Sequence, residues 1–414
     1  MALYNLFIRL YKFGMHLAAL WLPKAAGWLK GRETLFEDLG ESIKPTGKII
    51  WMHCASAGEF EQGKPVLEAL KKAYPNYKFL VSFFSPSGYK VGKKYAGADI
   101  VTYLPLDTAK NANRFIKLVN PALVVFVKYD YWYHHLKAVS DQRIPLLLIS
   151  AIYRDNQIFF KPHGNFHRKM LHLFSWLFVQ DNESVERLNK IGITHCSVSG
   201  DTRFDRVSAI INSANKIELI ETFTGEQPTI VAGSTWVEDE SLFGEIASDL
   251  PYKLIIAPHE ISTKNIKRLL DLFRGKALTF SQLESGATNP SVYAVLIIDN
   301  IGMLSRLYQH ATISYIGGGF NKSGIHNTLE AAAWGKPVIF GPNYQKFREA
   351  RELISVGGAF SIANAIELKE AIKGLEGEQL RISSEAARIY VETNGGATAA
   401  ILQYIQENRL LTTA

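Results

Sequence analysis

The chain has 414 residues, of which 47% are hydrophobic and 21% charged, so a disordered or low-complexity protein is excluded and two α/β domains are expected. Its two cysteines, Cys54 and Cys196, are too few for a disulfide framework and lack metal-ligand spacing, which indicates a reducing compartment and no required metal. The net charge of +7 favours a polyanionic partner, and nucleic acid, an anionic membrane and a phosphorylated substrate all qualify.

Residues 1–38 predict a membrane-associated helix followed by a connector. The run from Leu3 to Leu22 is almost wholly apolar, and its polar members share one helical stripe: Asn5, Arg9, Lys12 and His16. Because these charges interrupt a run of only about 20 residues, we predict a helix that lies in the membrane interface rather than one that spans it. A helix buried against its own protein is the alternative. We therefore expect an anionic membrane surface, and not nucleic acid, as the polyanionic partner.

Residues 39–206 repeat a pattern of apolar strand, loop and helix. Near-continuous apolar strands that alternate with helices indicate a parallel sheet covered on both faces. The predicted strands are residues 48–53, 79–83, 100–103, 123–127, 146–150, 177–179 and 195–198. This segment is the predicted N-terminal, Rossmann-like acceptor domain.

A polar stretch at residues 207–227 ends before Pro228 and is the predicted inter-domain linker. Residues 228–414 then repeat the alternation and form the predicted C-terminal nucleotide-sugar domain. Its predicted strands are residues 229–232, 253–257, 294–298, 312–316 and 337–340. The final helix, near residues 397–408, can pack back on the first domain. The fold class is therefore α/β, with two Rossmann-like domains facing a cleft.

The loop from His53 to Glu59 follows the first predicted strand at the edge where open α/β sheets bind ligands. Its small residues, Ser56 and Gly58 among them, let the backbone approach a ligand closely. Glu59 falls in the first turn of the next helix, where a carboxylate has two possible roles. It acts as a general base, or it only complements the positive end of the helix.

Two loops of the second domain have the composition of a phosphate site. Ala232 to Thr235 places small hydroxyl residues at a predicted helix start, although Ser and Thr are also ordinary caps. In the segment Gly317 to Glu330, three successive glycines can cradle a phosphate, with Lys322 near enough to add a cation. The spacing is not that of a nucleoside-triphosphate P-loop, and a glycine turn used only for packing is the alternative. A further loop, residues 340–347, presents polar side chains at the same edge.

The chain resembles, over nearly its full length, the 3-deoxy-D-manno-octulosonic acid (Kdo) transferases of Gram-negative lipopolysaccharide synthesis. The matching segments are residues 53–59, 200–205, 232–235 with Glu238 and Glu240, 317–330, and Gly341-Pro342 with Phe347. The resemblance implies a GT-B fold and an inverting transfer of Kdo from CMP-Kdo to a lipid A precursor, lipid IVA. It also implies no cofactor and a location at the cytoplasmic face of the bacterial inner membrane.

The resemblance assigns roles to single residues. Glu59 matches the general base of the family. The residues expected to contact CMP-Kdo are Ser234, Thr235, His259, Gly318, Gly319, Lys322, Asn327 and Glu330. The residues expected at the acceptor or in the cleft are Ser56, Gly58, Asp130 and Trp132.

Two segments depart from the pattern of the family. The acidic E-T-E-x-W-P motif appears here as Lys128 to Tyr133, in which only Asp130 and Trp132 keep their chemical character. The Arg-His-Pro segment appears as Ala257 to Glu260, without the arginine, so we expect His259 or Lys322 to contact phosphate instead. Residues 159–178 mix cations with aromatic side chains and suit either a phosphorylated lipid or an ordinary amphipathic surface.

Two alternatives to Kdo transfer stay open at this stage. One is an enzyme of the same fold that uses a UDP-sugar, such as a lipid A disaccharide synthase or a nucleotide-sugar epimerase. The other is a membrane-bound sugar-nucleotide binding protein without catalysis. Comparing the thermal shift caused by CMP with that caused by UDP distinguishes the first alternative from Kdo transfer. The effect of Glu59→Ala on turnover distinguishes the second.

Overall fold

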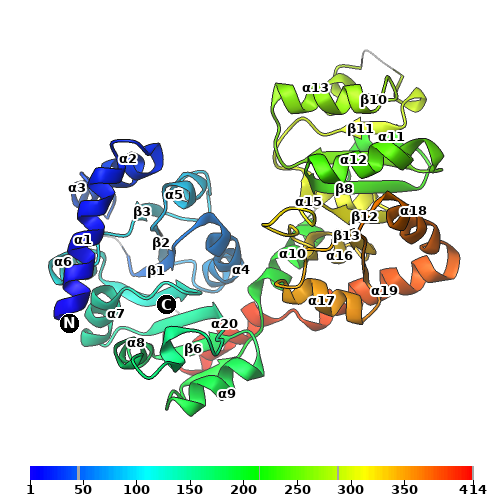
Figure 1. The fold of residues 1–414 in the computed structure, drawn as a ribbon. Helices are drawn as coiled ribbons and strands as arrows, with labels where there is room; N and C mark the ends of the chain where they lie inside the picture. Colours follow the sequence, from blue (N-terminus) through cyan, green and yellow to red (C-terminus); the bar gives the residue numbers. More distant parts are fainter. Residues whose placement is uncertain (44–46, 214, 287–288, 413–414) are drawn as a thin grey trace. The chain divides into compact units, whose positions relative to one another are not determined.

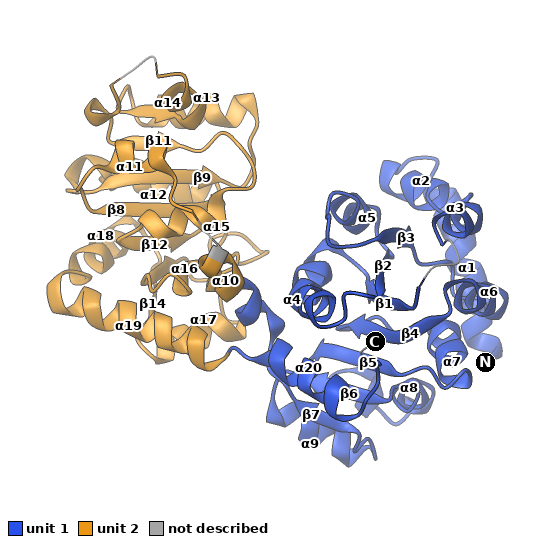
Figure 2. Cartoon of the chain, turned by 180° about the vertical axis from the view of Figure 1, so that it is seen from behind, with its two compact units in different colours: residues 1–206, 395–414 blue, residues 207–394 orange. Residues whose placement is uncertain are grey.

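A computed structural model describes residues 1–43, 47–213, 215–286 and 289–412 (Figure 1). The chain divides into two compact units, which we call unit 1 and unit 2 (Figure 2). Unit 1 comprises residues 1–206 and 395–414, and unit 2 comprises residues 207–394. Each unit is a parallel sheet covered by helices, as the alternating pattern predicts.

The sheet of unit 1 has seven parallel strands in the order β3-β2-β1-β4-β5-β6-β7, which is a Rossmann-like order. Its strands are β1 (Ile49–Cys54), β2 (Lys78–Phe83), β3 (Ile100–Tyr103), β4 (Pro121–Val127), β5 (Leu146–Ala151), β6 (Trp176–Val179) and β7 (Cys196–Val198). All seven predicted strands of this unit are confirmed, with ends shifted by at most two residues.

Both faces of this sheet are buried, because successive side chains of a strand point to opposite faces. Trp51 and Phe126 pack on one face, and Met52 and Val125 pack on the other. The helices of unit 1, apart from α1, are α2 (Pro23–Lys30), α3 (Leu35–Ser42), α4 (Ala57–Ala73), α5 (Pro86–Gly92), α6 (Ala109–Val119), α7 (Tyr133–Asp141), α8 (Asn165–Leu171), α9 (Asn182–Lys190) and α20 (Ala397–Glu407), with the short 3₁₀ turn η1 (Ile158–Phe160).

Helix α1 (Ala2–Ala18) packs on unit 1 by one narrow face. Ile8 is buried, and the Tyr4 hydroxyl donates to the buried carboxylate of Asp107. The large apolar side chains of the other faces are exposed: Leu3, Leu6, Phe7, Leu10, Phe13 and Leu17, followed by Leu20, Trp21 and Leu22. Among the described helices, none combines the length and the hydropathy needed to cross a bilayer. The helix is thus neither fully buried nor a span.

The sheet of unit 2 also has seven parallel strands, in the order β10-β11-β9-β8-β12-β13-β14. They are β8 (Thr229–Thr235), β9 (Lys253–Pro258), β10 (Ala277–Thr279), β11 (Val295–Ile297), β12 (Ile313–Ile316), β13 (Val338–Phe340) and β14 (Ala359–Ser361). The prediction missed β10 and β14, since each has only three residues and forms an edge of the sheet.

The helices of unit 2 lie before β8, between its strands and after β14. They are α11 (Glu218–Thr224), α12 (Val237–Ile246), α13 (Thr263–Leu272), α14 (Phe280–Glu284), α15 (Leu304–Leu307), α16 (Leu329–Ala332), α17 (Arg348–Ser355), α18 (Ala365–Gly374) and α19 (Gly377–Thr393). Three 3₁₀ turns join them: η2 (Ala247–Asp249), η3 (Pro290–Val292) and η4 (Tyr308–His310).

The unit boundary differs from the predicted linker at residues 207–227. It falls within α10 (Thr202–Ser213), and α11 belongs to unit 2, where Ile220 and Phe223 are buried. The last helix, α20, belongs to unit 1 rather than to the segment 228–414. Its Ile401 and Ile405 enter the core on the α4 side of the sheet. Because Ile220 and Phe223 are buried, the predicted linker at residues 207–227 includes a helix that belongs to the core of unit 2.

Candidate active site

The order of strands reverses next to the first strand of each sheet, between β1 and β4 in unit 1 and between β8 and β12 in unit 2. Open α/β sheets bind ligands at such a switch point, outside the carboxyl ends of the strands. Glu59 lies in the first turn of α4, the helix that follows β1, and Asp130 lies in the loop that follows β4. The loops that follow β8 and β12 carry Trp236 and the glycines 317–319. Each unit thus places predicted site residues at its own switch point.

Glu59 is the third residue of α4 and forms a capping box with Ser56. Its Oε2 accepts hydrogen bonds from the Ser56 backbone N–H at 2.8 Å and from the Ser56 hydroxyl at 3.1 Å. Burial raises the pKa of Glu59 above the usual range, the negative charge of Asp130 adds to this, and the Ser56 hydrogen bonds oppose it. The helix-capping role is therefore present, and the upward shift of the pKa is in the direction that suits a general base.

Asp130 is held beside β1 by a buried histidine. Its Oδ2 lies 2.6 Å from His53 Nε2, and His53 Nδ1 lies 2.8 Å from Ser82 Oγ. Ser82 Oγ also accepts the Trp51 indole N–H at 2.7 Å. A neutral His53 with its proton on Nε2 satisfies every bond, since Ser82 then donates to Nδ1. The pairing of His53 with Asp130 was not predicted from the sequence.

The other predicted acceptor residues lie around the same edge. Ser56 caps α4, and Gly58 is exposed, where an added methyl group would meet only Ser56 Oγ at 3.9 Å. The fold therefore does not require glycine at position 58. The Trp132 ring stacks on Phe84 at 4.7 Å and shares a pocket wall with Asp130. A Cβ on Gly88, which was not predicted, would lie 2.6 Å from the Phe83 ring and 3.1 Å from the backbone of Ser56.

In unit 2 the glycine loop is held by Asp239, the third residue of α12, which is fully buried. Its Oδ2 accepts the backbone N–H groups of Trp236 and Gly318, each at 2.9 Å, and its Oδ1 accepts the Tyr315 hydroxyl at 2.6 Å. Burial raises the pKa of Asp239, and the three hydrogen bonds oppose that shift. Asp239 therefore joins β12, the glycine loop and the start of α12.

The glycines of this loop serve close packing. A Cβ on Gly317 would lie 2.3 Å from the Ser234 carbonyl oxygen, and one on Gly319 would lie 2.5 Å from the backbone of Gly341. Gly318 has φ +91°, a conformation that side chains rarely adopt. Its N–H is bonded to Asp239 and is not available to a phosphate. The predicted alternative, glycines required by packing, accounts for all three positions.

The remaining residues predicted to bind the donor surround this loop. Thr235 is buried and its hydroxyl donates to Glu240 at 2.9 Å, so that hydroxyl faces the interior. Ser234 has φ +54°, a strained conformation for a residue with a side chain. The exposed His259 ring stacks on Trp236 at 4.5 Å and lies 4.6 Å from the ring of His326, which adjoins Gly318.

Asn327 and Glu330 are joined by a hydrogen bond of 3.0 Å from Asn327 Nδ2 to Glu330 Oε1. Asn327 precedes α16, and its Oδ1 accepts the Leu329 N–H. Only Glu330 is helical, but the side chains of the two residues lie together. Lys322 is exposed at the tip of the same loop.

Residues 159–178 do not form one amphipathic surface. Phe159 and Leu171 are buried in the core, and Arg168 donates to the Phe159 and Lys161 carbonyls. These cationic and aromatic groups therefore hold η1 and α8 in place. Over the described ranges, no three His, Cys, Asp or Glu side chains are grouped closely enough to hold a metal ion.

Comparison with known proteins identifies the relatives of the chain. Residues 31–206 match the family model of 3-deoxy-D-manno-octulosonic-acid transferases. The Kdo transferase of Aquifex aeolicus is 29% identical over 338 residues, which cover 79% of this chain and 86% of that protein. The Kdo transferase of Chlamydia muridarum is 27% identical over 356 residues, which cover 82% of this chain and 81% of that protein.

Solved structures share the two-unit fold at low sequence identity. UDP-GlcNAc 2-epimerase from Neisseria meningitidis has a TM-score of 0.62 at 16% identity and covers 87% of this chain and all of its own. MurG from Acinetobacter baumannii has a TM-score of 0.53 at 12% identity and covers 87% of this chain and 99% of its own. These likenesses concern the fold alone. The chain thus has a GT-B-type fold of two parallel sheets and is a glycosyltransferase that is similar to the Kdo transferases along most of its length.

Proposed function

We propose that the chain transfers Kdo from CMP-Kdo to a lipid A precursor, lipid IVA, with inversion and with Glu59 as the general base. The observation that carries the proposal is the half-buried Glu59 carboxylate, which has a raised pKa and lies at the switch point of the sheet of unit 1. The proteins that the chain resembles in sequence are Kdo transferases. One oxygen of Glu59 is held by Ser56, which orients the group.

The reaction forms one bond and breaks one bond. The acceptor hydroxyl oxygen attacks the anomeric carbon of Kdo while Glu59 takes the hydroxyl proton. The bond between that carbon and the phosphate oxygen breaks, and CMP leaves with the electron pair from the opposite face. The protonated Glu59 then releases its proton to water. The His53–Asp130 pair keeps a negative charge near Glu59, which favours proton uptake.

The donor is proposed to bind the unit 2 loops. Exposed His259, beside Trp236 and His326, and exposed Lys322 present cationic or donor groups suited to a phosphate. The Asn327–Glu330 pair presents an amide and a carboxylate suited to ribose hydroxyls. Because Thr235 faces the interior, its proposed contribution is to hold the loop through Glu240.

The test is an assay with CMP-Kdo and a tetra-acylated lipid A precursor, in which the product mass counts the Kdo residues added. We expect product with wild type and none with CMP-Kdo omitted. A thermal shift with UDP but not with CMP would favour a UDP-sugar enzyme of the same fold instead. Unchanged turnover in Glu59→Ala would contradict the assignment of the base.

We also propose that the protein works at the cytoplasmic face of the bacterial inner membrane, with α1 in the interface. The exposed apolar side chains of α1 support this, because a face of that size is costly to leave in water. Sedimentation with phosphatidylglycerol vesicles tests it. We expect Leu10→Glu with Leu17→Glu to weaken vesicle binding by about tenfold. Val292→Glu, at an exposed apolar residue of unit 2, is the matched control. Equal binding by the variant and the control would overturn the proposal.

A further inference from the structure

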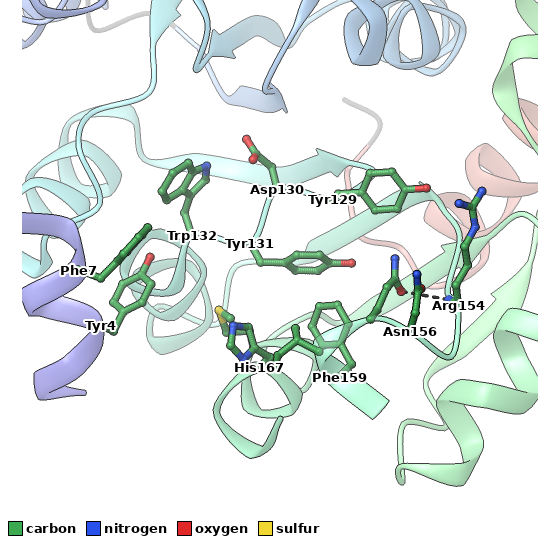
Figure 3. Close-up of a pocket in the computed structure, with 13 residues that line it drawn as sticks. Tyr4, Phe7, Tyr129, Asp130, Tyr131, Trp132, Arg154, Asn156, Phe159 and His167 are labelled. Atoms are coloured by element: carbon green, nitrogen blue, oxygen red, sulfur yellow. Dashed lines mark hydrogen bonds between the residues drawn. The ribbon is translucent and has the colours of Figure 1, made fainter. Parts of the chain in front are cut away.

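A pocket of about 650 Å³ opens in unit 1 between α1, the loop after β4 and the turn η1. Most of its wall is aromatic or aliphatic: Tyr4, Phe7, Tyr129, Tyr131, Trp132, Ile158, Phe159 and Met170. Figure 3 shows Tyr4, Phe7 and Trp132 at one end, and Arg154 with Asn156 at the other. Its size is that of a small-ligand site, and one end is apolar while the other is polar.

The apolar end of this pocket continues onto the exposed face of α1. Successive residues of an α-helix are rotated by about 100° around its axis. The residues of α1 that contact unit 1 and the exposed apolar residues therefore lie on neighbouring faces of the helix. Phe7 lies between these two faces. It is 56% exposed, and it also lines the pocket beside Tyr4. The polar stripe of α1, which includes Lys12 and His16, faces a different pocket. A molecule that lies against the apolar face of α1 can therefore enter past Phe7.

The wall of the pocket includes a residue that acts on the proposed base. Asp130 lines the pocket, and its charge acts on Glu59. Within the described residues, the buried Trp132 Nε1 and His167 Nδ1 have no hydrogen-bond partner, and both residues belong to the pocket wall. An indole N–H can only donate, so Trp132 lacks an acceptor. The carbonyl that joins a fatty acyl chain to a sugar is such an acceptor.

We propose that this pocket binds one acyl chain of the lipid acceptor, with the chain lying past Phe7 toward the apolar face of α1. The inference rests on the proposed function for the identity of the acceptor. An acyl chain fits the aromatic and aliphatic wall, and its ester or amide carbonyl fits the unpartnered Trp132 N–H. The chain would hold the attached sugar beside Asp130 and Glu59. The pocket thus contributes to the choice of acceptor.

The first test needs neither donor nor turnover, because it measures binding of the fluorescent fatty acid parinaric acid. We expect saturable binding by wild type and affinity about tenfold weaker in Ile158→Trp, which fills the pocket. Ile158→Val is the conservative control. Phe7→Glu, at an exposed residue, should weaken binding similarly. Leu3→Glu makes the same change on α1 outside the pocket wall and should leave the affinity within about twofold. No binding by wild type, or equal loss in Phe7→Glu and Leu3→Glu, would overturn the inference.

The second test compares the acylated acceptor with its fully deacylated form in the transfer assay. Ile158→Trp should raise KM for the acylated acceptor by about tenfold and leave KM for the deacylated acceptor and for CMP-Kdo unchanged. Equal changes with both acceptors would mean that the pocket holds the sugar, which contradicts the inference. Parinaric acid binding that depends on Ile158 and Phe7, without Kdo transfer by wild type, would leave the pocket assignment standing and refute the proposed function.

Discussion

Glu59 in unit 1 and Asp239 in unit 2 are each the third residue of the helix that follows the first strand of the sheet. Each accepts a hydrogen bond from the backbone N–H just before that helix, of Ser56 in one unit and of Trp236 in the other. Asp239 is fully buried and also accepts hydrogen bonds from the Gly318 backbone N–H and the Tyr315 hydroxyl. Glu59 is only half-buried, and within the described residues its Oε1 has no hydrogen bond.

The difference shows how one position supports two roles. A helix start attracts a carboxylate for electrostatic reasons alone, so the position by itself does not indicate catalysis. Asp239 has no access to a ligand and holds the glycine loop together. Glu59 has one oxygen without a hydrogen bond to the described residues and a raised pKa, and that combination suits proton transfer. The predictions below test this contrast.

The largest expected effect is that of Glu59→Gln. The amide keeps the shape of the side chain but cannot take a proton, so kcat should fall on the order of a hundredfold or more. CMP-Kdo binding, measured by calorimetry, should stay unchanged because the donor is assigned to unit 2. Asp239→Asn is the matched carboxylate-to-amide change in unit 2, and it should affect donor binding and stability instead. A fall of less than tenfold in Glu59→Gln would contradict the base assignment.

Asp239→Ala should destabilise the protein by about 2 kcal/mol, since it leaves the N–H groups of Trp236 and Gly318 and the Tyr315 hydroxyl without an acceptor. Urea unfolding measures the change. CMP binding should weaken as well, because the glycine loop loses its anchor. Unaltered stability would mean that the loop is held by its own packing alone.

Asp130→Asn should move the acid limb of the pH–rate profile to lower pH. The base works when deprotonated, and its pKa is raised partly by the charge of Asp130. Removal of that charge lowers the pKa of Glu59, so activity should persist to a lower pH than in wild type. Because the Asn Oδ1 can still accept the His53 Nε2–H, kcat on the plateau should fall by less than about tenfold. An acid limb that stays in place would show that burial alone sets the pKa.

The smallest effect on stability is expected for Gly58→Ala, within about 0.5 kcal/mol of wild type, because a methyl group there meets only Ser56 Oγ at 3.9 Å. Gly318→Ala is the contrasting variant, since its φ of +91° and the Gly324 carbonyl oxygen at 2.7 Å both oppose a side chain. If Gly58→Ala keeps its stability but loses turnover, a substrate approaches that backbone closely. If the two variants have the same melting temperature, the expected difference between positions 58 and 318 is wrong.

Much of the fold was predictable from the sequence, but less of the site. The apolar runs predict the central strands, and Ser56 followed three residues later by Glu59 is a recognisable capping box. Asp130 and Trp132 were predicted at the site through the resemblance. The partner of Asp130 was not predicted, because His53 lies 77 residues away and meets it only through the pairing of β1 with β4.

The last helix is a second example of this limit. The Asp205 carboxylate accepts the backbone N–H groups of Gly396 and Thr398, each at 2.6 Å, and so caps α20 from 191 and 193 residues away. The segment 200–205 matches the family pattern, but its spacing alone indicates no physical role for Asp205. The structure supplies that role, because a carboxylate near a helix start binds the unpaired N–H groups.

Periodicity and local propensity, by themselves, determined the two parallel sheets, the loops at their carboxyl ends and the alternating faces of α1, because these depend on residues a few positions apart. Only the tertiary structure decided that Asp239 is fully buried while Glu59 is half-buried, that the glycines 317–319 serve packing, and that Phe7 belongs to a pocket wall. Burial and the choice of partner depend on which strands and helices become neighbours, and that order is a property of the whole chain.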